Sequence, residues 1–547
     1  MTELLTALSV MFIVAGPFLL IANRFDLPTV PGFILAGLIA GLFIDENITQ
    51  ELARWGIALL VFMFGARIRP EVLRTALSDS ELAAITQVLV LGGLGFAVGL
   101  LFVPADQAIY LGVAAAFSST IVGTALLQTD IRKDRLRGRL AESIQFVQDL
   151  VAIVVVLVLG AEAATADAVA TELGYGVVLL VAAVFVYRYV FVVFQRIAGD
   201  SDELMIIGVI ALLAMFLGAA ELAEVSIVVG SFAAGLAIRA DSAESLGLAN
   251  GLESIHDFFI AIFFVTVGTL VAIPSFDVLL MALLLGVLTA VVKPAVMTAI
   301  LIYQGYEGRS ATLTSLSLDQ VSEFALIIAI EALILGLIVQ DVFDAIILAA
   351  AATMITSTLS RRFDEQIYRV LADRVIPESR HLKVDRHSAV PEDMSDHIVI
   401  VGYGRQGQYL RNTCETQNIP YVVVENDPLL LDEMESECES YVFGDAVEPY
   451  VWEKARVTEA RLVLSTVDST PVSRRLLSLT DGTDVILRSD SAPTALEFLE
   501  SGALYVAVSG LLASERLVEH IDSILSGEIA PEELREKSLP SGGGHGT

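Results

Sequence analysis

Thirteen apolar segments in the first 360 residues limit what this chain can fold into more than any other feature. A helix needs about 20 residues to cross the roughly 30 Å hydrocarbon layer of a bilayer. The segments are near that length and almost free of charge, and they cover residues 4–22, 29–45, 53–68, 82–104, 108–128, 141–160, 175–195, 204–220, 224–240, 256–273, 277–303, 311–332 and 341–358. The sequence therefore predicts a polytopic α-helical membrane protein.

Basic residues predict how the segments are oriented. Arginine or lysine follows the odd-numbered segments, as Arg24 follows the first and Arg361 and Arg362 follow the last. Loops that stay in the cytoplasm retain these residues. We therefore expect a multi-pass protein of the cell membrane whose N-terminus lies outside and whose C-terminal part is cytoplasmic.

A seven-residue pattern occurs twice and indicates two halves of opposite orientation. Residues 32–38, Gly-Phe-Ile-Leu-Ala-Gly-Leu, recur 198 residues later as Gly-Ser-Phe-Ala-Ala-Gly-Leu at 230–236. The copies fall in the second and ninth segments, so they run oppositely, as in the inverted repeats of secondary transporters. Close packing of small residues would also produce this pattern. The same offset relates polar interruptions at 117–124 and 315–322, where unwound backbone can line an ion pathway.

Asp149 lies deep within an apolar segment, directly after Gln148. Burying a charge there costs at least about 2.5–3.5 kcal/mol, so such residues are expected to serve function. A proton and a monovalent cation competing for one carboxylate give a minimal antiport mechanism, with Gln148 as an oxygen ligand. A single central acid favours one cation for one proton, which is electroneutral exchange.

The two polar interruptions supply further candidate ligands. The first offers the hydroxyls of Ser119 and Thr120. The second offers Asp319, Gln320 and Glu323. The carboxylates of Asp319 and Glu323 either contact the ion or bind the freed N–H groups of a half-helix. Both interruptions are therefore expected at the ion site.

Lys293 also lies inside an apolar segment, directly before Pro294. A buried ammonium needs a counter-charge, and Asp149 is the candidate. The pair is either a permanent strut between two helices or a site where the ammonium competes with the transported cation. The sequence leaves both open.

From residue 396 onward, charged residues become frequent and strands alternate with helices. An apolar strand at 397–401 runs into a glycine pattern, a second strand at 421–424 ends in an acid, and further strands are expected at 440–443, 462–465 and 485–488. Glycines at this spacing let a pyrophosphate approach a helix N-terminus, and the acid binds ribose hydroxyls. The predicted nucleotide ligands are Gly402, Tyr403, Gly404, Arg405, Gln406, Gly407, Glu425, Asn426, Asp445 and Ala446. A Rossmann-like fold with a vacant site is the alternative.

The membrane part resembles the Kef-type branch of the monovalent cation:proton antiporters. The resemblance lies in Ser118-Ser119-Thr120, Gln148-Asp149, Lys293 and the stretch 319–324, where position 319 departs from the family serine. It implies crossed discontinuous helices, alternating access, a homodimer joined through both parts of the chain, and K⁺ rather than Na⁺ as the favoured cation. Gly444-Asp445-Ala446 resembles the RCK nucleotide-binding domain, which implies a regulatory adenine nucleotide, AMP, ATP or NAD(H), and no covalent cofactor.

These features predict a chain of four parts. Residues 1–360 form the transmembrane domain, 361–395 a linker, 396–510 the RCK domain, and 511–547 a helix and flexible tail.

Several other functions fit the sequence less well. A net charge of −32 excludes nucleic acid as a partner and, with arginine favoured over lysine, is typical of halophilic proteins. The chain is not expected to be an enzyme. A membrane-anchored nicotinamide enzyme would need a catalytic set of His, Tyr or Lys, and no such set accompanies the glycine pattern. An RCK-gated cation channel is the nearer alternative, but it would need a selectivity filter of backbone carbonyls, and the membrane part contains no filter sequence such as Thr-Val-Gly-Tyr-Gly. An electrogenic Na⁺/H⁺ antiporter remains a further alternative, and Cys414 and Cys438 receive no role.

Overall fold

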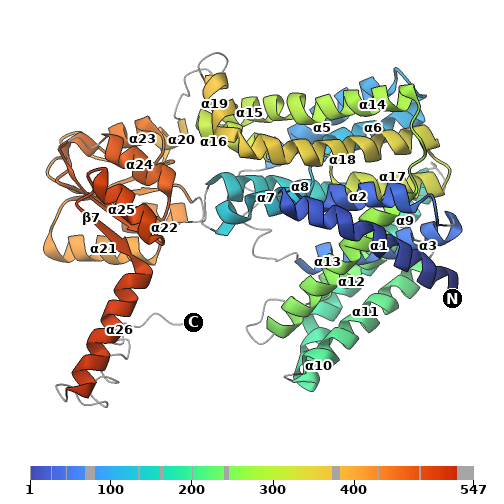
Figure 1. Ribbon diagram of the computed structural model, residues 1–547, viewed down its shortest axis with the longest axis horizontal. Helices are drawn as coiled ribbons and strands as arrows, with labels where there is room; N and C mark the ends of the chain where they lie inside the picture. Colours follow the sequence, from blue (N-terminus) through green and yellow to red (C-terminus); the bar gives the residue numbers. More distant parts are fainter. Residues whose placement is uncertain are drawn as a thin grey trace. The chain divides into compact units, whose positions relative to one another are not determined.

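The structure is a computed structural model. It describes residues 2–25, 27–44, 46–67, 81–132, 136–159, 166–199, 201–223, 225–238, 246–372, 382–427, 430–479 and 482–526. The chain divides into two compact units, Met1–Ser379 and Arg380–Thr547 (Figure 1). Most of the predicted tail, 527–547, lies outside the described residues.

Helices are the only regular secondary structure in the described residues of the first unit. Its helices are α1 (Thr2–Arg24), α2 (Thr29–Ala40), α3 (Glu46–Arg67), α5 (Glu81–Gly99), α6 (Ala105–Ala116), α7 (Thr120–Arg132), α8 (Leu136–Leu159), α9 (Ala166–Phe185), π-helix η1 (Val186–Val190), α10 (Phe191–Ala198), α11 (Asp202–Leu222), α12 (Ile227–Leu236), α13 (Leu246–Thr269), α14 (Phe276–Val287), π-helix η3 (Leu288–Val292), α15 (Lys293–Tyr303), α16 (Gly308–Leu316), α17 (Glu323–Ile334), α18 (Gln340–Arg362) and α19 (Asp364–Ala372).

Eight spans in the described chain are long and apolar enough to cross a membrane. Helices α2 and α12 are apolar but have only 12 and 10 residues. The predicted number of thirteen spans therefore stays a prediction.

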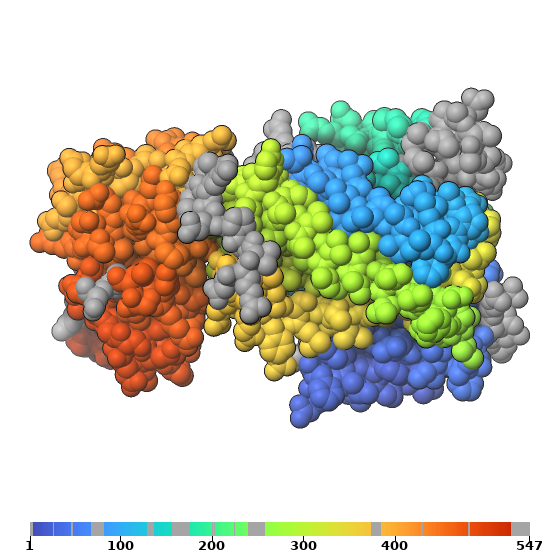
Figure 2. Space-filling model, turned by 90° about the horizontal axis from the view of Figure 1, so that it is seen from above, coloured from blue at the N-terminus to red at the C-terminus, as the bar shows by residue number. Residues whose placement is uncertain are grey.

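Apolar side chains cover much of the outer surface of this unit. Ile13 and Leu20 of α1 are each 73% exposed, and Val181 of α9 is 64% exposed. Such a surface suits lipid, in which apolar groups need not be buried. Figure 2 shows α14 and α15 running between α5 and α18, with which they pack.

Two helix crossings depend on glycine. A Cβ on Gly37 of α2 would lie 2.0 Å from the carbonyl oxygen of Val265 and 2.8 Å from Cα of Gly268, in α13. A Cβ on Gly235 of α12 would lie 2.1 Å from the carbonyl oxygen of Phe62 and 2.8 Å from Cα of Gly65, in α3. Only glycine permits backbones to approach this closely.

The second unit is built around a seven-stranded sheet. Its strands are β1 (Ser388–Ala389), β2 (Ile398–Val401), β3 (Tyr421–Glu425), β4 (Tyr441–Phe443), β5 (Leu462–Ser465), β6 (Asp484–Ser489) and β7 (Tyr505–Val508). The order is β1-β4-β3-β2-β5-β6-β7, and every pair is parallel except β1 with β4. The order reverses between β2 and β5, which makes a doubly wound sheet, and sheets of this kind bind ligands at the point of reversal. The five predicted strands are confirmed, whereas β1 and β7 were not predicted.

The helices of this unit follow the strands. They are α20 (Leu382–Arg386), α21 (Arg405–Gln417), α22 (Leu431–Glu437), α23 (Pro449–Lys454), the 3₁₀ helix η5 (Val457–Glu459), α24 (Thr470–Leu479), α25 (Ala492–Glu500) and α26 (Ser509–Leu525). Helix α21 follows β2 after the short loop 402–404, so its N-terminus lies at the edge where the strand order reverses.

Replacing Gly235 with Ala should destabilise the first unit by about 1–3 kcal/mol, because the new methyl group forces α12 away from α3. Gly218→Ala in α11 is the matched control, since its Cβ would meet nothing within 4 Å. Thermal unfolding of the purified protein in detergent measures both. Equal melting temperatures for the two variants would contradict the close crossing.

Candidate functional site

Two helices are interrupted in the first unit, and their interruptions meet. Helix α6 ends at Ala116 and α7 begins at Thr120; α16 ends at Leu316 and α17 begins at Glu323. The Ser118 hydroxyl donates to the carbonyl oxygen of Leu318 at 2.8 Å. The side-chain amide of Gln320 donates to the carbonyl oxygen of Ser119 at 3.2 Å. We call this meeting point, residues 117–119 and 317–322, the crossing.

Lys293 lies on the side of the crossing where α6 and α16 end and leave carbonyl groups without helical partners. Its fully buried ammonium donates to the carbonyl oxygens of Phe117 at 2.9 Å and Gln320 at 3.0 Å. Phe117 caps the C-terminal end of α6, where the helix dipole is negative. The expected pairing with Asp149 is therefore wrong for this structure, because the ammonium reaches backbone carbonyls instead.

The helix that carries Lys293 is adapted to the proline after it. The π-helix η3 ends at Val292, directly before Lys293 and Pro294. Proline cannot donate to the helix ladder and crowds the preceding turn. A π-helical turn absorbs this irregularity, and such turns recur at functional sites.

The carboxylates of Asp149 and Glu323 lie on the opposite side of the crossing, where α7 and α17 begin with free backbone N–H groups. Asp149 of α8 accepts a hydrogen bond from the Thr120 hydroxyl at 2.6 Å. Glu323 accepts one from the backbone N–H of Ile121 at 3.2 Å. Both carboxyl groups are buried, and they are close enough to interact electrostatically. Helices α7 and α17 begin here, so their dipoles favour negative charge.

Glutamine side chains satisfy the backbone around the crossing. Gln148 accepts from the N–H of Ser118 at 3.0 Å, so its oxygen is already engaged, which the sequence did not indicate. Gln145 donates to the carbonyl oxygen of Ser119 at 2.8 Å, and Gln87 donates to that of Ala116 at 2.8 Å. Sequence reasoning missed Gln87 and Gln145, although both are polar residues within apolar segments.

The unwound stretch before α17 has its own partners on α18. The Gln320 side-chain oxygen accepts from the Ser357 hydroxyl at 3.1 Å, and the N–H of Val321 donates to the Thr353 hydroxyl at 3.2 Å. Asp319 is fully buried, and neither of its carboxylate oxygens has a hydrogen-bond partner in the described part of the chain. The structure thus gathers all eight predicted ion-site residues around one crossing.

The second unit presents a glycine loop at the point where its strand order reverses. Gly402 has φ +94°, which favours glycine, and a Cβ on Gly407 would lie 1.9 Å from the carbonyl oxygen of Gly402. Gly404, Arg405 and Gln406 are exposed at the start of α21, which has no side-chain cap. A helix N-terminus left open in this way favours an anion.

Glu425, predicted to bind ribose, is engaged by the protein backbone. Its carboxylate accepts from the N–H groups of Tyr403 at 2.6 Å, Asn426 at 2.6 Å and Asp427 at 2.9 Å. Burial raises the pKa of Glu425, while these N–H groups act in the opposite direction. The carboxylate therefore fixes the glycine loop.

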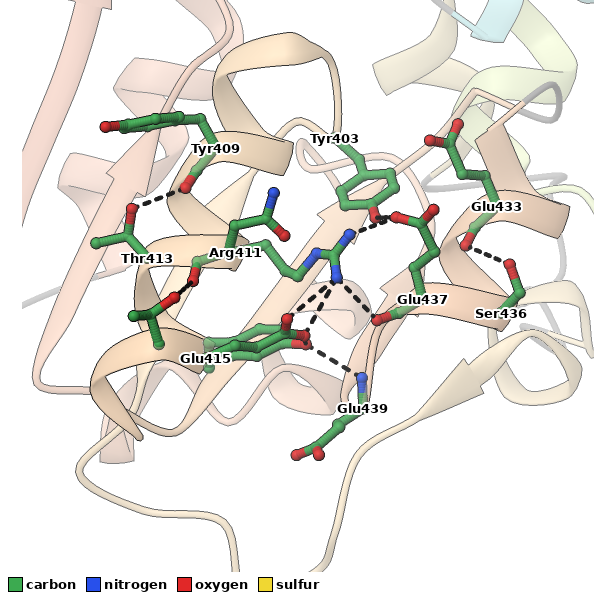
Figure 3. Close-up of polar contacts among 12 residues, drawn as sticks. Tyr403, Tyr409, Arg411, Thr413, Glu415, Glu433, Ser436, Glu437 and Glu439 are labelled. Atoms are coloured by element: carbon green, nitrogen blue, oxygen red, sulfur yellow. Dashed lines mark hydrogen bonds and ion pairs between the residues drawn. The ribbon is translucent and has the colours of Figure 1, made fainter. Parts of the chain in front are cut away.

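A polar network holds Tyr403 in the glycine loop (Figure 3). Its hydroxyl donates to Glu437 at 3.0 Å, and burial raises the pKa of Tyr403. Arg411 binds both Glu415 and Glu437, and its guanidinium lies 5.9 Å from the centre of the Tyr403 ring. This network joins the loop, α21 and α22.

The last predicted ligands follow β4. Asp445 accepts from the N–H of Val447 at 3.0 Å, and the carbonyl oxygen of Ala446 accepts from the Trp452 indole at 2.8 Å. They form a turn beside the end of β3, because β4 pairs with β3. The turn therefore lies at the same edge of the sheet as Glu425.

Two family models match the chain. Residues 8–362 match the transmembrane sodium/hydrogen exchanger, and residues 398–509 match the TrkA-N domain. The first match covers the whole crossing, and the second covers the glycine loop and the sheet from β2 to β7.

Three curated proteins resemble the chain over most of its length. YbaL of Escherichia coli strain K12, named for cation/proton antiport, is 24% identical over 96% of this chain and 99% of its own. KefB of Alkalimonas amylolytica, named for K⁺ efflux antiport, is 25% identical over 91% and 78%. The glutathione-regulated potassium-efflux protein KefC of Cronobacter sakazakii is 25% identical over 84% and 74%.

Replacing Thr353 with Val should lower the unfolding free energy by about 1–3 kcal/mol, because the buried N–H of Val321 loses its acceptor. Thr314→Val is the matched control, since its equally buried hydroxyl has no partner in the described chain. Thermal unfolding in detergent compares them. A control as unstable as Thr353→Val would show that the threonine shape, and not the hydrogen bond, is what matters.

Proposed function

The chain belongs to the transmembrane sodium/hydrogen exchanger family and carries a TrkA-N domain, and we propose that it is a secondary transporter that exchanges K⁺ for protons by alternating access. One observation carries the proposal: two buried carboxylates, Asp149 and Glu323, lie at the starts of α7 and α17. The names of KefB and KefC favour K⁺ over Na⁺.

In the proposed mechanism, a proton and a cation compete for the Asp149 carboxylate. When Asp149 is deprotonated, the cation binds there, and oxygens of Ser119, Thr120 and Glu323 replace part of its hydration shell. Protonation of Asp149 removes the negative charge and releases the cation. The amide ends of α7 and α17 stabilise the empty carboxylates between the two states.

The stoichiometry has two candidates. Exchange of one cation for one proton at Asp149 is electroneutral and is the simpler. The closeness of Glu323 to Asp149 favours the second candidate, in which both carboxyls carry protons and each turnover moves net charge. An imposed membrane potential separates them, because only net charge movement responds to voltage.

Several observations support the proposed membrane arrangement. Each of the thirteen predicted segments overlaps a described helix of the first unit. Gly37 and Gly235, at the same place in the repeated pattern, each cross a glycine of the other half, which supports an inverted repeat. The orientation with the N-terminus outside rests on the arginine pattern.

We also propose a homodimer, with a second copy covering α26. This helix has no buried residue, and Leu511, Leu517 and Val518 are each more than half exposed. An apolar helix face left open in one chain supports contact with the same face of another. The predicted contact through the membrane domain belongs to the same proposal.

Regulation by an adenine nucleotide completes the proposed function. AMP, ATP or NAD(H) would supply phosphates to the open N-terminus of α21. The residues that would hold it are Gly402, Tyr403, Gly404, Arg405, Gln406, Gly407, Glu425, Asn426, Asp445 and Ala446. A Cβ on Gly404 would meet no protein atom within 4 Å. An added methyl group would therefore clash only with a bound nucleotide.

Asp149→Asn should abolish K⁺-driven proton movement in proteoliposomes, because an amide neither exchanges a proton nor balances a cation. Asp344→Asn is the control: Asp344 is also buried, but it binds the N–H of Ala272 and the side chain of Gln340. The control should retain exchange, recorded with a pH-sensitive dye. Robust exchange by Asp149→Asn would contradict the mechanism.

Gly404→Ala should weaken nucleotide binding by about tenfold or more, roughly 1.4 kcal/mol, without unfolding the second unit. Gly407→Ala is the contrast, since its Cβ would collide with Gly402 and destabilise the domain itself. Calorimetry with AMP, ATP and NADH measures affinity, and fluorescence of the buried Trp452 reports folding. Unchanged affinities in Gly404→Ala would refute the site.

A further inference from the structure

The charged groups at the crossing fall into two separate pairs. Lys293 and Asp319 are close enough to interact electrostatically, and so are Asp149 and Glu323. The hydrogen bonds of the ammonium go to Phe117, Gln320 and Ser118. Among the described residues, the Lys293 ammonium forms no direct ion pair with either Asp149 or Asp319, so its charge acts on both across a longer distance.

Asp319 lacks the hydrogen-bond donors that usually stabilise a buried carboxylate. It is fully buried, and its oxygens have no hydrogen-bond donor among the described residues. Ser357 and Ser360 lie beside it on α18, but their hydroxyls donate to Gln320 and to the carbonyl oxygen of Thr356. A buried charge without hydrogen bonds is costly unless an opposite charge lies nearby.

The buried Lys293 ammonium, in turn, needs a negative charge nearby. Its ammonium is fully buried, and its two shortest hydrogen bonds go to neutral carbonyl groups. Gln320, which supplies one of those carbonyls, directly follows Asp319 in the chain. The ammonium and the Asp319 carboxylate therefore lie on the same side of the crossing and offset each other's charge.

We propose that Asp319 is the counter-charge of Lys293, and that this pairing leaves Asp149 free to alternate between a proton and a cation. The proposal rests on the proposed antiport function. Asp319 is a positioning residue, because it acts on the ion site through Lys293. The resembling family stretch has serine at this place.

The pairing has a consequence for transport. With Asp319 ionised, the field of the ammonium at Asp149 is largely cancelled. Without it, the uncompensated ammonium repels a cation at Asp149 and favours the deprotonated carboxylate. Loss of Asp319 should therefore weaken cation binding and shift the pH dependence of exchange to lower pH.

The test is a double-mutant cycle of Asp319→Asn and Lys293→Gln in the full-length protein. Asp319→Asn should raise the apparent KM for K⁺ at least about tenfold and move the pH profile to the acid side, and the double variant should restore both. Unchanged KM and pH profile in Asp319→Asn, or a double variant that is no better than the single, would overturn the proposal.

A second readout does not depend on transport. Each single variant should melt several degrees lower, on the order of 5 °C, and the double variant should recover at least about half of the loss. The cycle of Lys293→Gln with Asp149→Asn is the control and should show no recovery. Recovery in the control instead would identify Asp149 as the partner. If wild-type protein moves no K⁺, the antiport function fails, while the melting cycle still decides the pairing.

Discussion

Two interrupted helices in a layer without water impose the constraint on which the rest of the first unit depends. Where α6 and α16 stop, their last carbonyl groups lose intrahelical partners, and where α7 and α17 start, so do their first N–H groups. Lipid cannot satisfy them. Gln87, Gln145, Gln148 and Thr353 therefore supply hydrogen bonds from neighbouring helices.

The same constraint determines where the positive and the negative side chains lie. A cation is stable beside carbonyl ends, and carboxylates are stable beside amide ends. Lys293 occupies the first position, and Asp149 and Glu323 occupy the second. The proposed cation site thus lies where the helix ends already tolerate negative charge, and the ammonium lies on the other side of the crossing.

Sequence reasoning recovered the features that interrupt a pattern. Asp149 and Lys293 break apolar segments, the two polar stretches break helices, and the glycine loop follows a strand. It failed where partners are backbone groups: the carbonyl of Phe117 carries no side-chain signal, so the ammonium was assigned to a carboxylate instead. Strand β1 has two residues, too few to leave a periodic pattern.

The end of the first unit is bonded to the helices of the crossing. Asp364 of α19 binds Arg137 of α8 at 3.2 Å and also Arg361, while Glu365 binds Arg309 of α16. Asp364 is only 6% exposed, so its pairs are less screened than surface pairs. Because α8 carries Asp149 and α16 leads into the crossing, these pairs join α19 to both helices. A displacement of α19 would have to break these pairs or move both helices with it.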